Sequence, residues 1–350
     1  MANQYCKMLS NSYRFMAKYG SFQYQPCCWV PYTSPVISKQ HLKKVQSEMT
    51  ENILDNKETA CKECNLRDQT NFRVSGRQRA NELVPDDAVD GDAYILEIQL
   101  DTECNAACSI CGPHFSSLWR KQLDTNNKDH HTVNHLYEKL PDLVSFEKLT
   151  KIYFAGGEPL LNELHLDILK LVPHPENIEL IYSSNGSVIP SLEVFDMWSK
   201  FQKVIIHFSI DDIEDRFTYT RWPLKWRRIN QVLAEFKLIA PNVKRIVHCT
   251  LTPMNIWYLP ELDAWINETN VIDDAVYSPC YGNLGLELTP LALRQDLTNR
   301  LPKDHAALKL INAYTLSEDI QPMLNYLDLV DKIRNSSWRE IFPDIVHYFK

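Results

Sequence analysis

The stretch that decides the fold is Leu100-Asp-Thr-Glu-Cys-Asn-Ala-Ala-Cys-Ser-Ile-Cys-Gly112, in which Cys104, Cys108 and Cys111 have the spacing C-x3-C-x2-C. The residues just before it, 94–100, alternate as a β-strand does. Three thiolates on one tight loop can bind three irons of a [4Fe–4S] cube. No fourth cysteine follows nearby in the sequence, so the fourth iron is left open for a small-molecule ligand. For this loop alone, a structural zinc site and simple packing are the alternatives.

A second motif follows about forty residues later. Residues 151–155 form a short apolar run that ends in Gly156-Gly157-Glu158-Pro159. Glycines at the end of a strand let the backbone approach a ligand closely. A carboxylate there can accept hydrogen bonds from an ammonium group. In isolation the four residues would indicate a turn, but after a cysteine loop they predict part of a binding site.

Three later strands also end in polar residues. The run 178–186 ends in Ser184-Asn185-Gly186, the run 203–211 ends in Ser209-Ile-Asp211 and is followed by Arg221, and the run 243–251 precedes Asn255. An arginine fork donates two parallel hydrogen bonds to a carboxylate. The alternatives are an ordinary surface ion pair for Arg221 and a helix cap for Asn255.

One cysteine accompanies the last predicted strand, 273–279. Cys280 lies at its carboxyl end, where barrel active sites form. We therefore treat Cys280 as a candidate substrate contact, with a buried packing role as the alternative.

Taken in order, these motifs resemble those of the radical S-adenosylmethionine (SAM) superfamily. The resemblance implies that the amine and carboxylate of SAM chelate the open iron of a cluster bound by Cys104, Cys108 and Cys111. The reduced cluster passes one electron to the sulfonium, and the resulting 5′-deoxyadenosyl radical abstracts hydrogen from a substrate. The SAM contacts it implies are Gly156, Gly157, Glu158, Pro159, Ser184, Asn185, Ser209, Arg221 and Asn255.

The strands recur with helical segments between them, for example 164–171 and 190–198. Such alternation predicts an α/β fold with parallel strands. About six such units between residues 92 and 285 suit the partial (β/α)6, TIM-like barrel of the superfamily. All the motifs described above lie after predicted strands, where the chemistry of such barrels sits.

The first ninety residues contain five more cysteines: Cys6, Cys27, Cys28, Cys61 and Cys64. With Gly20, Ser75 and Arg77 they resemble the auxiliary-cluster module called a twitch domain, a shortened SPASM domain, placed before the barrel. The resemblance implies a second [4Fe–4S] cluster on Cys6, Cys61, Cys64 and one of the adjacent pair. The sequence departs from the pattern in two ways: Gly20 stands far from Cys27, and no Pro-Trp follows Cys6. A four-cysteine zinc site is the alternative.

Bulk properties set the outer limits. The chain has 350 residues and 44% hydrophobic content, enough for a large buried core. No signal peptide and no apolar run of the ~20 residues that cross a bilayer is present, so we expect a cytoplasmic protein with reduced thiols. A formal net charge of −8 argues against a general nucleic-acid binder. We expect an auxiliary cluster module at 1–90, a barrel at 91–285 and a helical extension at 286–350.

The resemblance implies an enzyme that modifies a carbon atom in a larger substrate. Twitch and SPASM relatives commonly modify ribosomally made peptides by crosslinking, epimerisation or backbone excision at a tyrosine. A dehydrogenase or epimerase of a small molecule or sugar is the first alternative. A non-enzymatic iron–sulfur carrier is the second, and the missing fourth cysteine and the Gly-Gly-Glu-Pro motif argue against it. The expected partners are a flavodoxin or ferredoxin as reductant and a separate leader-peptide-binding protein, with no membrane partner.

Overall fold

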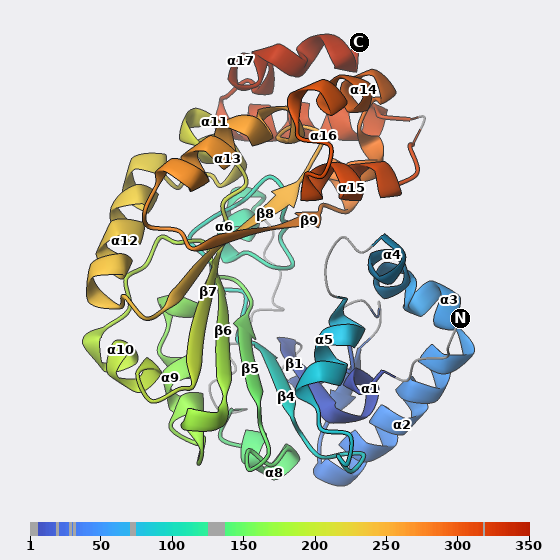
Figure 1. Cartoon of the computed structure of the whole chain (residues 1–350), viewed down its shortest axis with the longest axis vertical. Helices are drawn as coiled ribbons and strands as arrows, with labels where there is room; N and C mark the ends of the chain where they lie inside the picture. The colour runs from blue at the N-terminus through green and yellow to red at the C-terminus, as the bar shows by residue number, and fades with distance from the viewer. Residues whose placement is uncertain are drawn as a thin grey trace. The chain divides into compact units, whose positions relative to one another are not determined.

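Parallel strands joined by helices organise the chain in the computed structural model (Figure 1). The structure describes residues 6–18, 21–27, 30, 33–70, 75–124, 137–317 and 319–350. The chain divides into two compact units. The first comprises Met1–Glu103, Asn126–Ser183 and Pro190–Ile205, and the second comprises Cys104–Thr125, Ser184–Ile189 and Ile206–Lys350.

In the first unit the strands follow the order β3-β2-β1-β4-β5-β6, with the beginning of β7 next to β6. β1 and β2 pair antiparallel, as do β2 and β3, whereas β1–β4, β4–β5 and β5–β6 pair in parallel. The strand bounds are β1 Ser12–Lys18, β2 Ser21–Gln25, β3 Ser34–Val36, β4 Ile95–Gln99, β5 Lys151–Ala155 and β6 Glu179–Ser184.

The core of this unit follows from the period-2 pattern of its strands. In β5, Ile152 and Phe154 are fully buried while Tyr153 is half-buried, as alternation predicts. Phe154 stacks on Tyr182 of β6 with ring centroids 5.0 Å apart. Burying these side chains against the helices supplies the main stabilisation.

The helices of the first unit are short, apart from one in the N-terminal region. α2 packs along β3, and α1 contacts both α2 and α5 (Figure 1). Ser75 caps α5 with a full capping box to Gln78, which fixes where that helix begins. The bounds are α1 Met8–Asn11, α2 Lys39–Asp55, α3 Lys57–Ala60, α4 Lys62–Thr70, α5 Gly76–Leu83, α8 Leu140–Leu143, η1 Pro159–Leu161, α9 Leu164–Leu169, η2 Pro175–Asn177 and α10 Leu192–Trp198.

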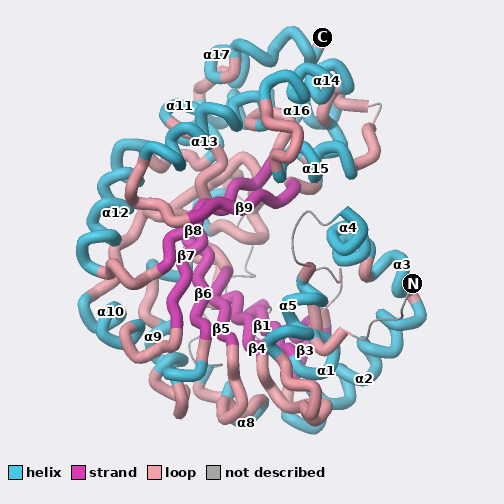
Figure 2. The backbone as a smooth tube through the Cα atoms, viewed as in Figure 1, coloured by secondary structure: helices cyan, strands magenta, loops and turns pink. Residues whose placement is uncertain are grey.

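In the second unit the end of β7 is followed by β8 and then β9, and β8 and β9 pair in parallel (Figure 2). Their bounds are β7 Lys203–Phe208, β8 Lys244–Leu251 and β9 Asp274–Pro279. The helices between and after them are α6 Ser117–Gln122, α11 Glu214–Thr220, α12 Trp226–Ile239, η3 Ile256–Tyr258, α13 Leu259–Glu268, η4 Gly282–Leu284, η5 Leu286–Leu288, α14 Leu291–Arg300, α15 Ala306–Ala313, α16 Gln321–Arg334, α17 Trp338–Ile341 and η6 Pro343–Phe349.

The α/β fold expected from the sequence is confirmed. Each of the six predicted barrel strands is present as β4 to β9, and parallel pairing is recorded for β4–β5, β5–β6 and β8–β9. The helical texture predicted after residue 286 corresponds to α14–α17. None of the helices among the described residues is long and apolar enough to cross a membrane.

The N-terminal region contributes more than the cysteine module that the sequence indicated. β1 pairs in parallel with β4 over five residues, from Ser12 opposite Ile95 to Met16 opposite Gln99. The sequence alone predicts no strand in this region, because such a short run forms a strand only by pairing with a partner more than eighty residues away. The strands β1–β3 therefore belong to the same sheet as β4.

Candidate functional site

The loop with the first three cysteines follows β4 and leads into α6, and its residues 104–111 form neither helix nor strand. Its start is fixed by Ser117, whose hydroxyl accepts from Cys104 N at 3.0 Å and donates to Cys104 O at 3.1 Å. Its middle pairs with the chain around Arg221: Ala107 N donates to Trp222 O at 2.7 Å and Ser109 N donates to Thr220 O at 2.8 Å. The loop is thus shaped by contacts from outside its own sequence.

Polar hydrogens point at two of the three sulfur atoms. Arg221 Nη1 donates to Cys108 Sγ at 3.6 Å, and Asn185 Nδ2 approaches Cys104 Sγ at 4.0 Å. Such contacts stabilise negative charge on sulfur. Burial, followed by the neighbouring Cys108, raises the pKa of the Cys111 thiol to about 12. Loss of the proton from this buried thiol therefore needs a compensating positive charge, which iron would supply.

Arg221 is held in place by a carboxylate that the sequence analysis left without a role. Its Nε donates to Asp211 Oδ2 at 2.6 Å, and both side chains are buried. Asp211 Oδ1 also accepts from Thr250 N at 2.8 Å, so β8 fixes the carboxylate. Burial alone would lower the pKa of Arg221, but Asp211 and Cys108 outweigh that effect and raise it. The pair is a buried ion pair and not the surface pair considered as an alternative.

The Ser184-Asn185 segment lies against the start of the cysteine loop. Asn185 Nδ2 donates to Asn105 Oδ1 at 2.8 Å, and Asn105 Nδ2 donates to Ser187 Oγ at 2.9 Å. Ser184 Oγ accepts from Gly186 N at 3.1 Å, and Ser184 O accepts from Ser209 N at 2.8 Å. The second unit therefore joins Ser184 to Ser209 through a backbone bond and joins the adjacent Asn185 to the cysteine loop.

The side chain of Asn255 is engaged within the turn after β8. Its Oδ1 accepts from Thr252 N at 2.8 Å, and its Nδ2 donates to Asp211 O and Thr250 O, both at 2.9 Å. It makes no side-chain cap to the following helix. Both ends of the amide are thus engaged in fixing the turn after β8, and a contact with SAM stays a prediction.

Cys280 is buried at the carboxyl end of β9, as predicted. Burial, with a further contribution from Asp211, raises the pKa of its thiol to about 12. The thiol donates weakly to Tyr281 O at 3.5 Å. These surroundings describe a packed, protonated thiol, and a role in binding substrate remains a prediction.

The Gly-Gly-Glu-Pro motif lies in the first unit, directly after β5. Gly156 has φ +130°, and a β-carbon on Gly157 would lie 2.0 Å from Glu103 O. Gly157 N donates to Asp101 O at 3.0 Å, and Glu158 N donates to Glu103 O at 2.8 Å. The glycines are therefore required by the close approach of the chain after β4.

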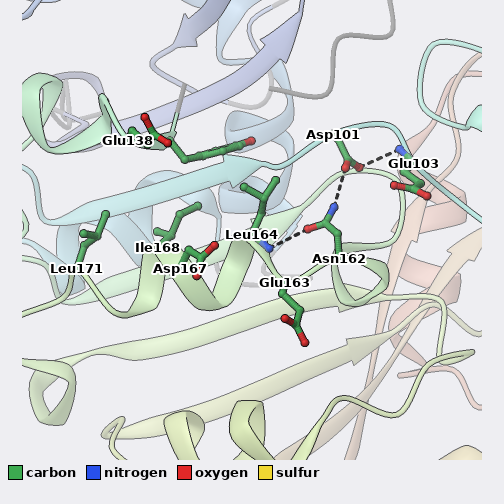
Figure 3. Close-up of a pocket in the computed structure, with 10 residues that line it drawn as sticks. Asp101, Glu103, Glu138, Asn162, Glu163, Leu164, Asp167, Ile168 and Leu171 are labelled. Atoms are coloured by element: carbon green, nitrogen blue, oxygen red, sulfur yellow. Dashed lines mark hydrogen bonds between the residues drawn. The ribbon is translucent and has the colours of Figure 1, made fainter. Parts of the chain in front are cut away.

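The side chain of Glu158 is fully buried, and its Oε1 accepts from Leu160 N at 3.2 Å. It thus caps the short helix η1, which begins at Pro159. A cavity of about 550 Å³ lies beside this segment (Figure 3), where Asn162 Nδ2 donates to Asp101 Oδ2 at 2.7 Å. Five carboxylates line it: Asp101, Glu103, Glu138, Glu163 and Asp167.

The N-terminal cysteines form a second group within the first unit. Cys6, Cys27 and Cys61 pack against the apolar residues Leu9, Val30 and Ile53. Burial raises the pKa of the Cys6 thiol to about 11, and the neighbouring Cys64 and Cys61 contribute. The thiols of Cys6, Cys61 and Cys64 therefore lie close enough to interact electrostatically. Cys28 and Gly20 fall outside the described residues.

Arg77 stands beside this second group. It donates to Asn65 Oδ1 at 3.1 Å and bonds Asp68; burial lowers its pKa, but Asp68, with smaller contributions from Cys64 and Cys6, raises it overall. A β-carbon on Gly76 would lie 4.0 Å from Cys64 Sγ. The Ser75-Gly-Arg77 run therefore borders Cys64.

Within the described ranges, no three or more His, Cys, Asp or Glu side chains are arranged to hold a single metal ion. A cube binds one cysteine to each iron, so the sulfurs of a cluster site do not converge on one point. The N–H groups directed at Cys104 and Cys108 fit a site for anionic sulfur.

Three comparisons place these features. Residues 100–266 match the family described as the radical SAM superfamily. A curated relative, the S-adenosylmethionine-dependent nucleotide dehydratase of Selenomonas ruminantium, is 23% identical over 177 residues, which are 47% of this chain and 58% of the relative. The chain thus spans little more than half the length of that relative.

Among solved structures, anSMEcpe with bound AdoMet is 16% identical, with a TM-score of 0.42, over 64% of this chain and 63% of that one. Streptococcus suis SuiB bound to the precursor peptide SuiA is also 16% identical, with a TM-score of 0.41, over 78% and 55% of the two chains.

Proposed function

We propose that this chain cleaves SAM reductively and abstracts hydrogen from a substrate, because residues 100–266 match the radical SAM superfamily. Members of that superfamily are enzymes that use SAM and a [4Fe–4S] cluster. The observation that carries the proposal is the loop 104–111, in which three cysteines lie together and two receive N–H contacts from Asn185 and Arg221.

Cys104, Cys108 and Cys111 would hold the cluster, which when bound supplies the electron that cleaves SAM. The chain's own residues prepare that site. Asn185 and Arg221 favour charge on the sulfurs, and Asp211 orients the arginine. Gly156, Gly157, Glu158, Pro159, Ser184, Asn185, Ser209, Arg221 and Asn255 remain the proposed SAM contacts.

For the substrate we favour a ribosomally made peptide that undergoes crosslinking, epimerisation or backbone excision. The support is the second cysteine group, because relatives with such modules commonly modify peptides. We propose that Cys6, Cys61, Cys64 and one of Cys27 and Cys28 hold an auxiliary [4Fe–4S] cluster, with zinc as the alternative. The proximity of the Cys6, Cys61 and Cys64 thiols, with Arg77 beside them, is consistent with this set. A flavodoxin or ferredoxin would supply electrons, and a separate protein would bind the leader peptide.

A second candidate is a nucleotide substrate. It is favoured by the curated relative, whose name describes a nucleotide dehydratase. A small-molecule dehydrogenase or epimerase belongs to the same alternative.

The test is anaerobic reconstitution followed by reduction with dithionite in the presence of SAM. We expect 5′-deoxyadenosine by liquid chromatography, and its complete absence from protein with a full iron complement would overturn the proposal. Peptides encoded by neighbouring genes and the common nucleoside triphosphates are then added with exchangeable and carbon-bound hydrogens labelled separately. Deuterium transferred from a carbon of one class into 5′-deoxyadenosine identifies the substrate class.

A further inference from the structure

The cysteine loop is unusual in how its carbonyl groups are satisfied. Four consecutive carbonyls each accept a hydrogen bond from a different side chain. The pairs are Ser116 Oγ with Ala106 O at 2.6 Å, Arg334 Nη2 with Ala107 O, Trp119 Nε1 with Cys108 O at 2.8 Å, and Tyr326 Oη with Ser109 O at 2.7 Å. Because residues 104–111 lie in no helix or strand, these side chains orient the peptide planes together with the backbone bonds made by Ala107 N, Ser109 N and Cys111 N.

The four donors come from two places. Ser116 caps α6 and Trp119 lies within it, so both are local to the loop. Tyr326 and Arg334 lie on α16, 217 and 227 residues from their acceptors. Two of these four side chains therefore belong to the C-terminal helical extension.

Arg334 also links the loop to the segment that carries Arg221. Its Nη1 donates to Tyr219 O at 3.0 Å. Its guanidinium lies 4.9 Å from the ring centre of Trp119 and 5.6 Å from that of Trp222. One side chain thus joins the loop, α6 and the end of α11, the three segments that shape the surroundings of Cys108.

We propose that α16 clamps the cluster loop and that Tyr326 and Arg334 are positioning residues for the cluster. They act through the peptide planes on either side of Cys108 and so fix where its sulfur lies. A metal site keeps its geometry only when the surrounding shell holds the ligands in place. The inference rests on the proposed function, because it assumes a cluster bound by Cys104, Cys108 and Cys111.

The alternative is that α16 only packs against the unit. Its apolar residues Met323, Leu327 and Val330 are fully buried and would dock the helix without the two polar contacts. Removing the hydroxyl of Tyr326 or the guanidinium of Arg334 should therefore leave the helix in place. This separation makes the two roles distinguishable.

The experiment compares Tyr326→Phe and Arg334→Met with two controls from the same extension. Tyr348→Phe removes a hydroxyl that bonds Asp296, and Arg339→Met removes a guanidinium that bonds Asp328 and lies over Trp338. Among the described residues, neither control side chain forms a hydrogen bond with the loop 104–111. Reconstituted, reduced protein is exposed to an iron chelator, and the EPR signal that changes on adding SAM is followed with time. Only the cluster with an open iron gives that response.

We expect the SAM-responsive signal to decay about five-fold faster in Tyr326→Phe and about ten-fold faster in Arg334→Met than in the wild type, from the loss of one and two hydrogen bonds. Arg334→Lys, which can still reach Ala107 O, should recover part of the difference. The unfolding temperature should shift no more than in the controls.

Decay rates equal to those of the controls would overturn the clamp. So would an unfolding temperature that falls in proportion to the faster decay, since that is the signature of packing alone. A wild type that binds iron but shows no SAM-responsive signal would overturn the proposed function, which is how its failure is told from failure of the clamp.

Discussion

The two cysteine groups differ in what surrounds their sulfur atoms. The loop 104–111 is bordered by polar hydrogens: Arg221 contacts Cys108, Asn185 approaches Cys104, and four carbonyls are tied to side chains. The N-terminal group lies against Leu9, Val30 and Ile53, with Arg77 as its cationic neighbour. The first environment is built to orient charge on sulfur, and the second mainly excludes water. Because their surroundings differ, we expect that each group can be perturbed without affecting the other.

The largest effect is expected from Cys104→Ala/Cys108→Ala/Cys111→Ala. Formation of 5′-deoxyadenosine should be lost, and iron should fall from about eight to about four per chain. Iron analysis and product chromatography after anaerobic reconstitution measure both. A triple variant that keeps its full iron content would show that these three cysteines do not bind a cluster.

The converse variant, Cys61→Ala/Cys64→Ala, should also lose about four irons but still form 5′-deoxyadenosine without substrate. Conversion of substrate should fail, because we expect the N-terminal group to serve turnover and not SAM cleavage. Circular dichroism checks that the variant stays folded, since loss of a metal can unfold its site. Normal product formation by a folded variant would show that the group is only a scaffold.

Arginine substitutions sharpen the contrast further. Arg221→Ala would leave Asp211 buried without its partner, so we expect a loss of about 3–5 kcal/mol of stability as well as of SAM binding. Arg221→Lys keeps the charge and loses the fork, so SAM affinity should fall roughly 10-fold with a smaller loss of stability. Isothermal titration with SAM and thermal unfolding measure the two effects.

Arg77→Lys is the matched control in the other group. Arg77 bonds Asp68 and lies beside Cys64, much as Arg221 bonds Asp211 and contacts Cys108. We expect its SAM affinity to equal that of the wild type. A similar loss in both lysine variants would mean that the arginines act through general stability.

Glu158→Gln tests the motif after β5. The amide keeps the shape and the cap to Leu160 N but removes the charge, so SAM affinity should fall by about 1.5–3 kcal/mol if Glu158 attracts the SAM ammonium. Glu103→Gln changes an exposed carboxylate whose backbone does the contacting, and it should bind SAM normally. Equal affinities in both variants would remove Glu158 from the site.

The smallest effect is expected within the adjacent pair Cys27 and Cys28. If one of them ligates the auxiliary cluster, only one of the two single alanine variants should lose iron. The other should match the wild type in iron content and in its UV–visible spectrum. Loss of iron in neither variant would reduce the N-terminal group to three ligands.

The sequence was sufficient for features that depend on neighbouring residues. Most strands after residue 92 were placed to within a residue or two, because their apolar runs are bounded by polar and glycine-containing segments, but the run 203–211 extends three residues beyond the end of β7. The same holds for the helices α14–α17, which lie within the helical extension predicted at 286–350.

Features that depend on distant partners were not accessible. β1 forms a strand by pairing with β4. Asp211 has a role because Arg221, at the end of α11, donates a hydrogen bond to it. Asp211 ended a run that was already recognised, so its strand-end position was the available signal. Tyr326 and Arg334 had none, because no spacing in the sequence relates them to carbonyls more than 200 residues earlier.

That separation has a consequence for how the protein is made. Ribosomes add about 5–20 residues per second, so the 217 and 227 residues that separate Ser109 from Tyr326 and Ala107 from Arg334 take roughly 10–45 seconds to synthesise. During that interval the nascent loop has its cysteines but lacks two of its four outer supports. Iron delivered while translation continues would meet a loop that lacks the support of α16. We therefore expect the cluster to be inserted into the complete loop only after the last helices have emerged.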